Sequence, residues 1–421
     1  MAKPKLALIP ATQGSKLYSV LPADGVGDFT FSRGSAATRI NKDGLIETVA
    51  SGVSRLNYPL IDGVVNGCPS HLLEPQRTNL VTYSENIESW LTQNAATVFV
   101  NNEISPDGSL NADEINSSVL NSAKYQSITT VNSTNYTFSL FIKNKNSQRC
   151  RIEIYNSPNA VLEINFTNNI PTTFSNSVFT NIKYEEHSNE WFKVTGSFTA
   201  TGTSNGFYIY PDRVNGSNSI YVWGVQVEQG SYPTSYIPTS GSSVTRSAET
   251  ANGAGDASTF SDSQGVLMAE ISALADLDNT RYITLNEGTS SVNILSIQYR
   301  NSGELRLYNG GTSTAQMIYR DTSLDLSEKI KIAIKYGTTS SSYKVYINGF
   351  SKTIESAFVA TTMSGLDNLK FTDANGSGSP FYGNTKQIQY FDSALNDSDL
   401  ETLTSWTSFT DMANGQLYSI K

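Results

Sequence analysis

Cysteine, histidine and charged residues are scarce in this sequence of 421 residues. It has two cysteines and two histidines, and Asp, Glu, Lys and Arg together make up 16%. Cys68 and Cys150 lie far apart, and neither belongs to a CxxC pair or has a histidine at metal-ligand spacing. We therefore expect two reduced thiols, with no disulfide framework, no metal site and no cofactor.

Excess positive charge and long apolar runs are missing as well. The formal net charge is −9, which argues against a protein that binds the phosphates of a nucleic acid. No apolar run approaches the roughly 18 residues that span a bilayer. The stretch Leu6–Ile9 is too short for the apolar core of a secretory signal. We expect a soluble protein that neither binds nucleic acid nor inserts into a membrane.

Helical periodicity is nearly absent, and β-structure patterns take its place. Short alternating runs rich in Tyr, Phe, Ile and Val are separated by Asn-Gly, Asp-Gly and Gly-Ser pairs. One helix is predicted over 396–403, with Asn396 as its N-cap and acidic residues in its first turn. The patterns predict an all-β protein, with an irregular N-terminal attachment module followed by two antiparallel β-sandwich (jelly-roll) domains.

Composition divides the chain into four stretches. Residues 1–82 contain arginine-rich and proline-rich turns but few long strands, so they are not expected to form a core of their own. Residues 83–240 and 263–421 each show a series of strands typical of a sandwich. Between them, residues 241–262 are rich in Ser, Gly and Ala, and we expect a flexible linker that does not pack.

Several side chains have a predicted structural role. Within 219–228, alternation places Trp223 on the same face as Val225 and Val227, which we take to be the inner face of the sandwich. In the first stretch, arginine side chains should bond loop carbonyls and carboxylates such as Glu47 and Glu74. These arginines are Arg33, Arg39, Arg55 and Arg77.

Three stretches carry a resemblance to known families. The run FSRGSAATRINKDGLIE, continued by RLNYP and LLEPQRTNLVTYSENIESW, resembles a module of tail, fibre and other virion structural proteins of tailed bacteriophages. The segment YVWGVQVEQGSYPTSYIPTSGSSVTRSAE resembles the closing strand and linker of carbohydrate-binding-module-like jelly rolls in the same phage proteins. The segments GVLMAEI, KIAIKYG, YKVYINGF and QIQYFDSALNDSDLETL are similar to concanavalin A-like or laminin-G-like sandwiches.

The resemblance implies a virion structural protein, either a tail fibre, a head fibre or a spike. Such a protein is assembled in the bacterial host cytoplasm and exposed on the particle surface. The implied partners are two further copies in a homotrimer, other virion proteins at residues 1–82, and host-surface glycans. A flexible linker after the second stretch would place residues 263–421 farthest from the particle, and we expect adhesion to host glycans there.

No pattern indicates catalysis, so no catalytic residue is predicted and we expect no enzyme. His71 and His187 belong to no nucleophile or metal motif, and no phosphate-binding glycine pattern is present. Adjacent carboxylates on a strand point to opposite faces, and those on a loop are solvated. The pairs in question are Glu185 with Glu186 and Asp276 with Asp278. The alternative function is a tailspike-type polysaccharide depolymerase, which would more usually bring a long repetitive β-helix. A secreted lectin is disfavoured because the sequence shows no signal peptide.

Glycan binding is the one ligand chemistry that the composition favours. Sugars are held by aromatic faces together with amide and carboxylate hydrogen bonds, and the sequence has 22 tyrosines. We expect the ligand-binding side chains in the last stretch. The candidates are Tyr299, Tyr308, Tyr319 and Tyr382.

Overall fold

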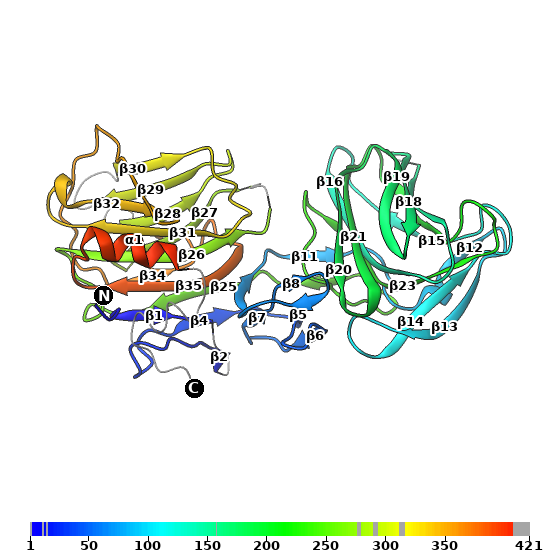
Figure 1. The fold of residues 1–421 in the computed structure, drawn as a ribbon, viewed down its shortest axis with the longest axis horizontal. Helices are drawn as coiled ribbons and strands as arrows, with labels where there is room; N and C mark the ends of the chain where they lie inside the picture. Colours follow the sequence, from blue (N-terminus) through cyan, green and yellow to red (C-terminus); the bar gives the residue numbers. More distant parts are fainter. Residues whose placement is uncertain are drawn as a thin grey trace.

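The computed structural model describes residues 2–10, 12–13, 16–156, 158–275, 279–288, 294–310 and 316–406. Over this part of the chain the fold is nearly all β, and the named strands pair antiparallel, so the predicted fold class is confirmed. Figure 1 shows two lobes joined by a narrower middle. No helix among the described residues is long and apolar enough to cross a bilayer.

One lobe, which we call the jelly roll, is a sandwich of two six-stranded sheets. The chain crosses between the two sheets several times, as in a jelly roll. In sheet order, the first sheet is β12 (Leu91–Gln93), β15 (Ala123–Thr129), β22 (Ser204–Tyr210), β17 (Arg149–Tyr155), β18 (Ala160–Thr167) and β19 (Ile170–Ser177). The second is β13 (Thr97–Ile104), β14 (Leu110–Asn116), β23 (Ser219–Gln229), β16 (Asn135–Asn144), β21 (Trp191–Thr199) and β20 (Thr180–His187). Apolar side chains between them, such as Phe138, Ile152 and Phe207, form the core.

The other lobe, which we call the composite sandwich, has strands from both ends of the chain. Its first sheet contains β33 (Phe350–Lys352), β32 (Lys344–Ile347), β31 (Ile330–Tyr336), β26 (Gly265–Ala273), β35 (Gly383–Phe391), β10 (Ser70–Leu73), β7 (Arg55–Asn57) and β1 (Leu6–Leu8). Its second contains β2 (Thr12–Gln13), β3 (Lys16–Leu17), β4 (Phe29–Ser32), β25 (Thr250–Ala254), β34 (Asn368–Lys370), β27 (Arg281–Asn286), β28 (Ile294–Tyr299), β29 (Leu305–Gly310) and β30 (Gln316–Asp321). Leu6, Phe29 and Leu73 share one buried cluster with Leu267 and Ile332.

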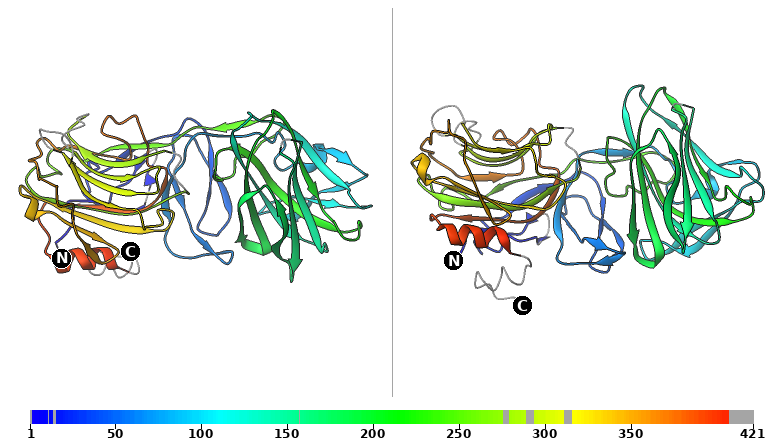
Figure 2. Two further views of the ribbon diagram at one scale, coloured as in Figure 1. Left: turned by 90° about the horizontal axis from the view of Figure 1, so that it is seen from above. Right: turned by 45° about the horizontal axis from the view of Figure 1, so that its top comes forward.

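The jelly roll is therefore inserted within the composite sandwich. Beside the point of insertion, the outgoing strand β11 (Arg77–Asn79) pairs with the returning strand β24 (Val244–Arg246). The views in Figure 2 agree that the N-terminal strands lie with the composite sandwich and away from the far end of the jelly roll. The first residues thus obtain their core from the same chain, and burial by a second subunit is not required.

The stretch 241–262 packs, so the expectation of an unpacked linker is wrong. Strand β25 pairs with β4 on one side and β34 on the other. Ala251 and Ala254 are fully buried in the core of the composite sandwich. The composition misled because small residues, which resemble a flexible linker in sequence, also suit a strand pressed between two neighbours.

Short elements complete the fold. The strands β5 (Ala37–Ile40) and β6 (Ile46–Val49) form a hairpin, in whose turn the Asn41 side chain accepts hydrogen bonds from the amides of Asp43 and Leu45. A second hairpin joins β8 (Leu60–Ile61) and β9 (Val64–Val65). The predicted helix is α1 (Asp397–Ser405), with Asn396 as its N-cap. Single 3₁₀ turns are η1 (Ile87–Ser89), η2 (Ser188–Glu190) and η3 (Ser340–Ser342).

Trp223 is buried, as expected, but on the opposite face of its strand. Gly224 has a φ of +62°, and the pairing of β23 with β16 shifts register beside it. This bulge breaks the alternation, so Val222 and Val225 both face the jelly-roll core. Trp223 instead packs outside that core against Phe141 and Tyr236, in a cluster that the β6 hairpin also contacts.

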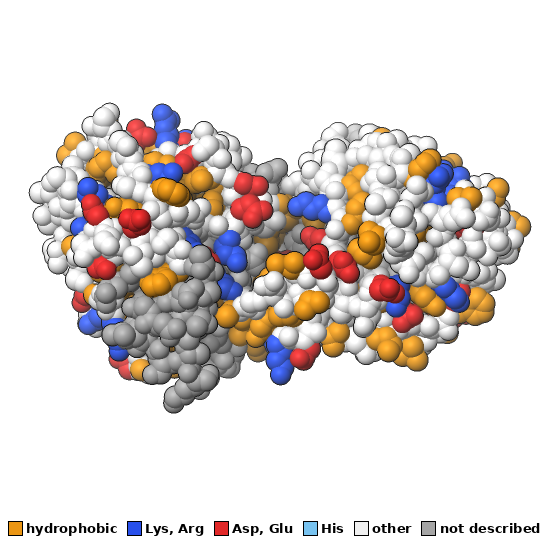
Figure 3. All heavy atoms as spheres, viewed as in Figure 1, with side chains coloured by type: hydrophobic (Ala, Val, Ile, Leu, Met, Phe, Trp, Pro, Cys, Tyr) orange, Lys and Arg blue, Asp and Glu red, His pale blue; other side chains and the backbone are white. Residues whose placement is uncertain are grey.

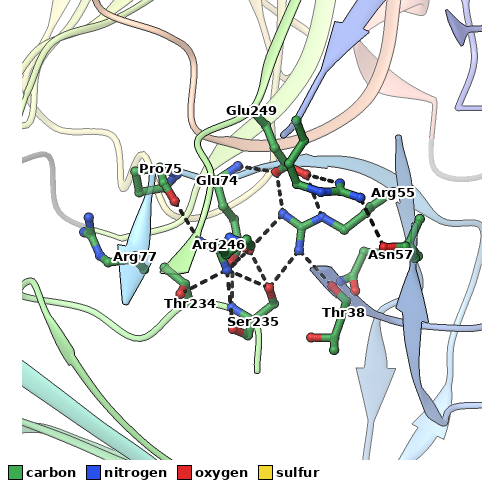
Figure 4. Close-up of polar contacts among 12 residues, drawn as sticks. Thr38, Arg55, Asn57, Glu74, Pro75, Arg77, Thr234, Ser235, Arg246 and Glu249 are labelled. Carbon is green, nitrogen blue, oxygen red and sulfur yellow. Dashed lines mark hydrogen bonds and ion pairs between the residues drawn. The ribbon is translucent and has the colours of Figure 1, made fainter. Parts of the chain in front are cut away.

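A buried arginine–glutamate network comprises Arg33, Arg55, Arg246, Glu74 and Glu249. It joins residues 33–74 to residues 246–249, and Figure 4 labels Arg55, Arg246, Glu74 and Glu249. Arg33 lies 2.7 Å from Glu249, Arg55 lies 2.8 Å from Glu74, and Arg246 lies 2.7 Å from Glu74. The Glu249 carboxylate also accepts the amide N–H of Glu74 at 2.8 Å. The predicted role of Arg33 and Arg55 in bonding carbonyls and carboxylates is confirmed.

The two other predicted arginines have the same role. Arg39 lies 3.2 Å from Glu47, in a partly exposed pair on the β5–β6 hairpin. Arg77 donates to the carbonyl of Gln76 and lies 3.7 Å from Glu228. The predicted guanidinium chemistry is therefore confirmed at all four positions.

Candidate functional site

Four tyrosines gather on the outer face of the jelly-roll sheet that contains β22. Tyr208 and Tyr210 are two residues apart on β22 and point to the same side, away from Phe207 and Ile209 in the core. The Tyr208 ring stacks on Tyr125 of β15, with centroids 4.4 Å apart and an interplanar angle of 7°. Tyr155 of β17 meets the Tyr208 ring edge-on at 5.8 Å. We call Tyr125, Tyr155, Tyr208 and Tyr210 the tyrosine cluster.

Gly206 allows Tyr208 to hold this position. A Cβ atom added at Gly206 would lie 2.4 Å from the Tyr208 ring, closer than any real contact. The ring therefore lies back over the bare backbone of its own strand. The absence of a side chain at Gly206 is what fixes the Tyr208 ring in the middle of the cluster.

A stripe of charged side chains continues the same face beyond the tyrosines. Arg149 and Arg151 of β17 alternate with core residues and lie beside Glu163 of the neighbouring strand β18. Arg151 donates from Nε to Glu163 at 3.1 Å, and Arg149 donates from Nε to Asn165 at 2.8 Å. Burial and the adjacent Glu153 raise the pKa of Tyr210, at the border between stripe and cluster, to about 12. The Tyr210 hydroxyl is thus a neutral hydrogen-bonding group at physiological pH.

This face is open because the opposite sheet makes the contact with the rest of the molecule. The cluster of Phe141, Trp191 and Trp223, which meets the β5–β6 hairpin, lies on the outer side of the sheet that contains β23. Figure 1 shows β15, β18 and β19 on the side of the jelly roll that is farther from β5 and β7. The Tyr155 side chain is 55% exposed, so an aromatic ring is available to a ligand.

The four predicted tyrosines occupy different surroundings and do not form one site. Tyr299 is fully buried against Phe381 in the core of the composite sandwich, so its prediction as a surface ligand residue is wrong. Tyr319 and Tyr382 are partly buried against the same core. Tyr308 lies half-buried on the outer side of β29, where its neighbour Arg306 donates toward its hydroxyl.

The residues considered for catalysis are dispersed. The His71 ring lies between Phe31 and Phe371, and the His187 ring packs edge-on against Phe141. Burial first, and then a neighbouring cation, lowers the pKa of each imidazole to about 3. Both are neutral packing residues.

Glu185 and Glu186 are exposed neighbours on β20, and Glu185 lines a hollow between the lobes that also borders His187. Figure 3 shows acidic and basic side chains on the surface where the two lobes meet. Asp276 and Asp278 lie outside the described residues.

The tyrosine cluster was missed by sequence reasoning, although a signal for it exists. In the run Gly206–Tyr210, strict alternation would have placed Tyr208 and Tyr210 on the outer face. The strand that carries Tyr125 was not predicted at all. Its inner positions hold Lys124 and Gln126, so the run lacks the apolar alternation that identifies a strand.

No family model and no curated protein matches the chain. Among solved structures, the CBM40 domain of the Ruminococcus gnavus IT-sialidase bound to alpha2,3-sialyllactose matches at 15% identity and a TM-score of 0.29, covering 36% of this chain and 86% of that domain. Domain 4 of AbnA, a GH43 extracellular arabinanase from Geobacillus stearothermophilus, matches at 14% identity and a TM-score of 0.29, covering 42% of this chain and 83% of that domain. The leech intramolecular trans-sialidase matches at 18% identity and a TM-score of 0.29, covering 35% of this chain and 24% of that protein. Matches this weak establish no relationship, and the expected bacteriophage origin stays a prediction.

Proposed function

We propose that this chain is a non-enzymatic glycan-binding subunit and that the tyrosine cluster is its binding surface. The observation that carries the proposal is a group of contacting tyrosine rings on an uncovered sheet face. Aromatic rings bind the C–H faces of sugars, while hydroxyl, amide and carboxylate groups bind the sugar hydroxyls. Both kinds of group are present here, because Tyr155 and Tyr208 adjoin Glu153 and Arg151 on the neighbouring positions of the sheet.

We propose further that the chain belongs to a fibre or spike of a tailed bacteriophage virion. The motif that runs from Phe31 to Trp90 supports this assignment through its resemblance to virion proteins. Homotrimer formation, contact with other virion proteins through residues 1–82, assembly in the host cytoplasm and exposure on the particle belong to the same proposal.

The insertion of the jelly roll within the composite sandwich changes the expectation of which lobe would face a host cell. Strand β1 lies in the composite sandwich, and the jelly roll is inserted at the other end of the molecule (Figure 1). An N-terminal attachment therefore favours the jelly roll as the outermost lobe, in place of residues 263–421.

A glycan array probed with the full chain and two tyrosine variants tests the binding proposal. We expect Tyr155→Ala and Tyr208→Ala to lose at least about fivefold in affinity for the glycans that the wild type binds. Each removes an aromatic contact that is worth about 1 kcal/mol or more. The matched control is Tyr308→Ala, which alters a half-buried tyrosine on the other lobe and should leave binding unchanged. Loss of binding in the control variant alone would place the site on the composite sandwich and contradict the proposal.

A further inference from the structure

We propose that the charged stripe beside the tyrosine cluster selects acidic glycans, with Arg149, Arg151 and Arg213 forming the seat for a carboxylate, sulfate or phosphate group. This inference rests on the proposed glycan binding and adds the class of sugar. It derives from the geometry of the three guanidinium groups and of the carboxylate that they share.

The three guanidinium groups converge on Glu163. Arg151 donates to Glu163 Oε1, Arg213 Nε lies 3.6 Å from the same oxygen, and Arg149 lies 3.6 Å from Glu163 Oε2. Arg151 has a second, longer contact of 3.5 Å with Glu153. Apart from Arg151, the arginines are therefore held near the carboxylate at distances longer than a good hydrogen bond, and their donors are incompletely used.

The arginines have more donors than this arrangement can satisfy. Each guanidinium carries five N–H groups in a fixed planar fork. Arg213 Nε is buried and has no hydrogen-bond partner among the residues that the structure describes. The nearby Asp212 carboxylate does not supply one, since it accepts from the amides of Val214, Asn215 and Ser217 and from the Asn218 side chain. An anion that arrives from solvent would accept from Arg149 and Arg151, whose side chains are partly exposed.

Solvent reaches the positive groups more easily than the negative ones. The side chains of Arg149 and Arg151 are 24% and 22% exposed, against 12% for Glu163 and 8% for Glu153. The carboxylates therefore lie deeper and serve to position the guanidinium groups, which form the accessible layer. This order favours an acidic ligand although the whole chain carries a net charge of −9.

Aromatic rings hold the guanidinium planes in position. Arg151 and Arg213 lie over the Tyr210 ring at 5.5 and 5.4 Å from its centroid. Arg149 lies over Phe174 at 3.2 Å. Tyr210 belongs to the tyrosine cluster and stacks on Tyr208 at 6.0 Å, so the anion seat and the sugar-stacking surface share a residue. A glycan whose ring contacts Tyr208 would bring an acidic substituent to the stripe.

The test compares acidic and neutral glycans on an array that carries carboxylated, sulfated, phosphorylated and uncharged oligosaccharides. Full-length wild type, Arg149→Gln and Arg151→Gln are measured at 50 and 500 mM NaCl, with thermal unfolding as the check of folding. We expect the wild type to prefer acidic glycans, and the preference to weaken at high salt because charge pairing is screened. Each Gln variant should lose at least tenfold in affinity for acidic glycans and should bind neutral glycans as the wild type does. Arg151→Lys keeps the charge but not the planar fork of the guanidinium group, and it should lose less affinity for acidic glycans than Arg151→Gln does.

The control variant is Arg320→Gln, which alters an exposed arginine of the composite sandwich that pairs with Glu355. It should bind as the wild type does. Equal binding of acidic and neutral glycans, or an acidic preference that survives in both Gln variants, would overturn the inference and leave the proposed function standing. A wild type that binds no glycan on the array would overturn both.

Discussion

At the scale of single residues, two buried imidazoles connect the stability of this protein to pH. His71 is fully buried, and within the described part of the chain neither of its ring nitrogens has a hydrogen-bond partner. Its pKa is lowered to about 3 by burial and by the Arg55 charge, so the folded state resists protonation. The unfolded chain binds a proton near pH 6.5. The contribution of the neutral His71 ring to the free energy of unfolding is therefore fully present above pH 6.5, and it falls as the pH drops from there toward 3.

We predict that His71→Leu reduces this loss. Between pH 7.5 and 5, the wild type should lose roughly 2 kcal/mol through His71, at 1.36 kcal/mol for each pH unit below 6.5. Urea unfolding of the wild type and the variant at both pH values measures the effect. Glu74 does not affect this comparison. Its pKa is lowered to about 2, so its contribution to stability is lost only below its unfolded pKa of 4.5. An equal pH dependence in the two proteins would show that His71 is not responsible.

At the scale of strands, Gly206 is the residue on which the shape of the binding surface depends. We predict that Gly206→Ala weakens glycan binding at least tenfold, because the added methyl group would displace the Tyr208 ring. The melting temperature should stay close to that of the wild type, since the Tyr208 ring lies on the outer face and outside the core. Binding as tight as that of the wild type would mean that the position of the Tyr208 ring does not matter.

Strands were predictable where one face is apolar and the other polar. In the strand Trp191–Thr199, alternation alone identifies Phe192, Val194 and Phe198 as the inner face, and the structure places all three in the core. The prediction failed at the bulge beside Gly224, because one extra residue reverses the face of every following side chain. The four ligand tyrosines were sought in the last stretch because sequence alone could not show which sheet faces are covered.

At the scale of the whole molecule, the pairing of distant segments was not predictable. Strand β35 pairs with β1 and β10, which precede it by more than 300 residues. Such pairing depends on the fit of whole sheets, whereas alternation and turn signals report only on neighbouring residues. The same holds for the arginine–glutamate network. Arg55 and Glu74 were expected to bond locally, but Arg55 also pairs with Glu249 and Glu74 with Arg246, and both of these partners lie beyond the inserted jelly roll.

We predict that Glu249→Gln destabilises the protein by about 3–5 kcal/mol, because it leaves Arg33 and Arg55 buried without their shared countercharge. The matched control is Glu47→Gln, which breaks the partly exposed pair with Arg39 and should change stability by less than about 1 kcal/mol. Urea unfolding of both variants compares the two. Equal effects would show that the buried network does not hold the two ends of the chain together.

The central claim is that the open face of the jelly roll binds glycans, and a crystal structure of the full chain with an array-selected oligosaccharide tests it most directly. The account predicts a sugar ring against Tyr155 or Tyr208, with an acidic substituent within hydrogen-bond distance of Arg149, Arg151 or Arg213. A sugar bound instead on the composite sandwich, beside Tyr308, or in the hollow beside Glu185 would contradict it.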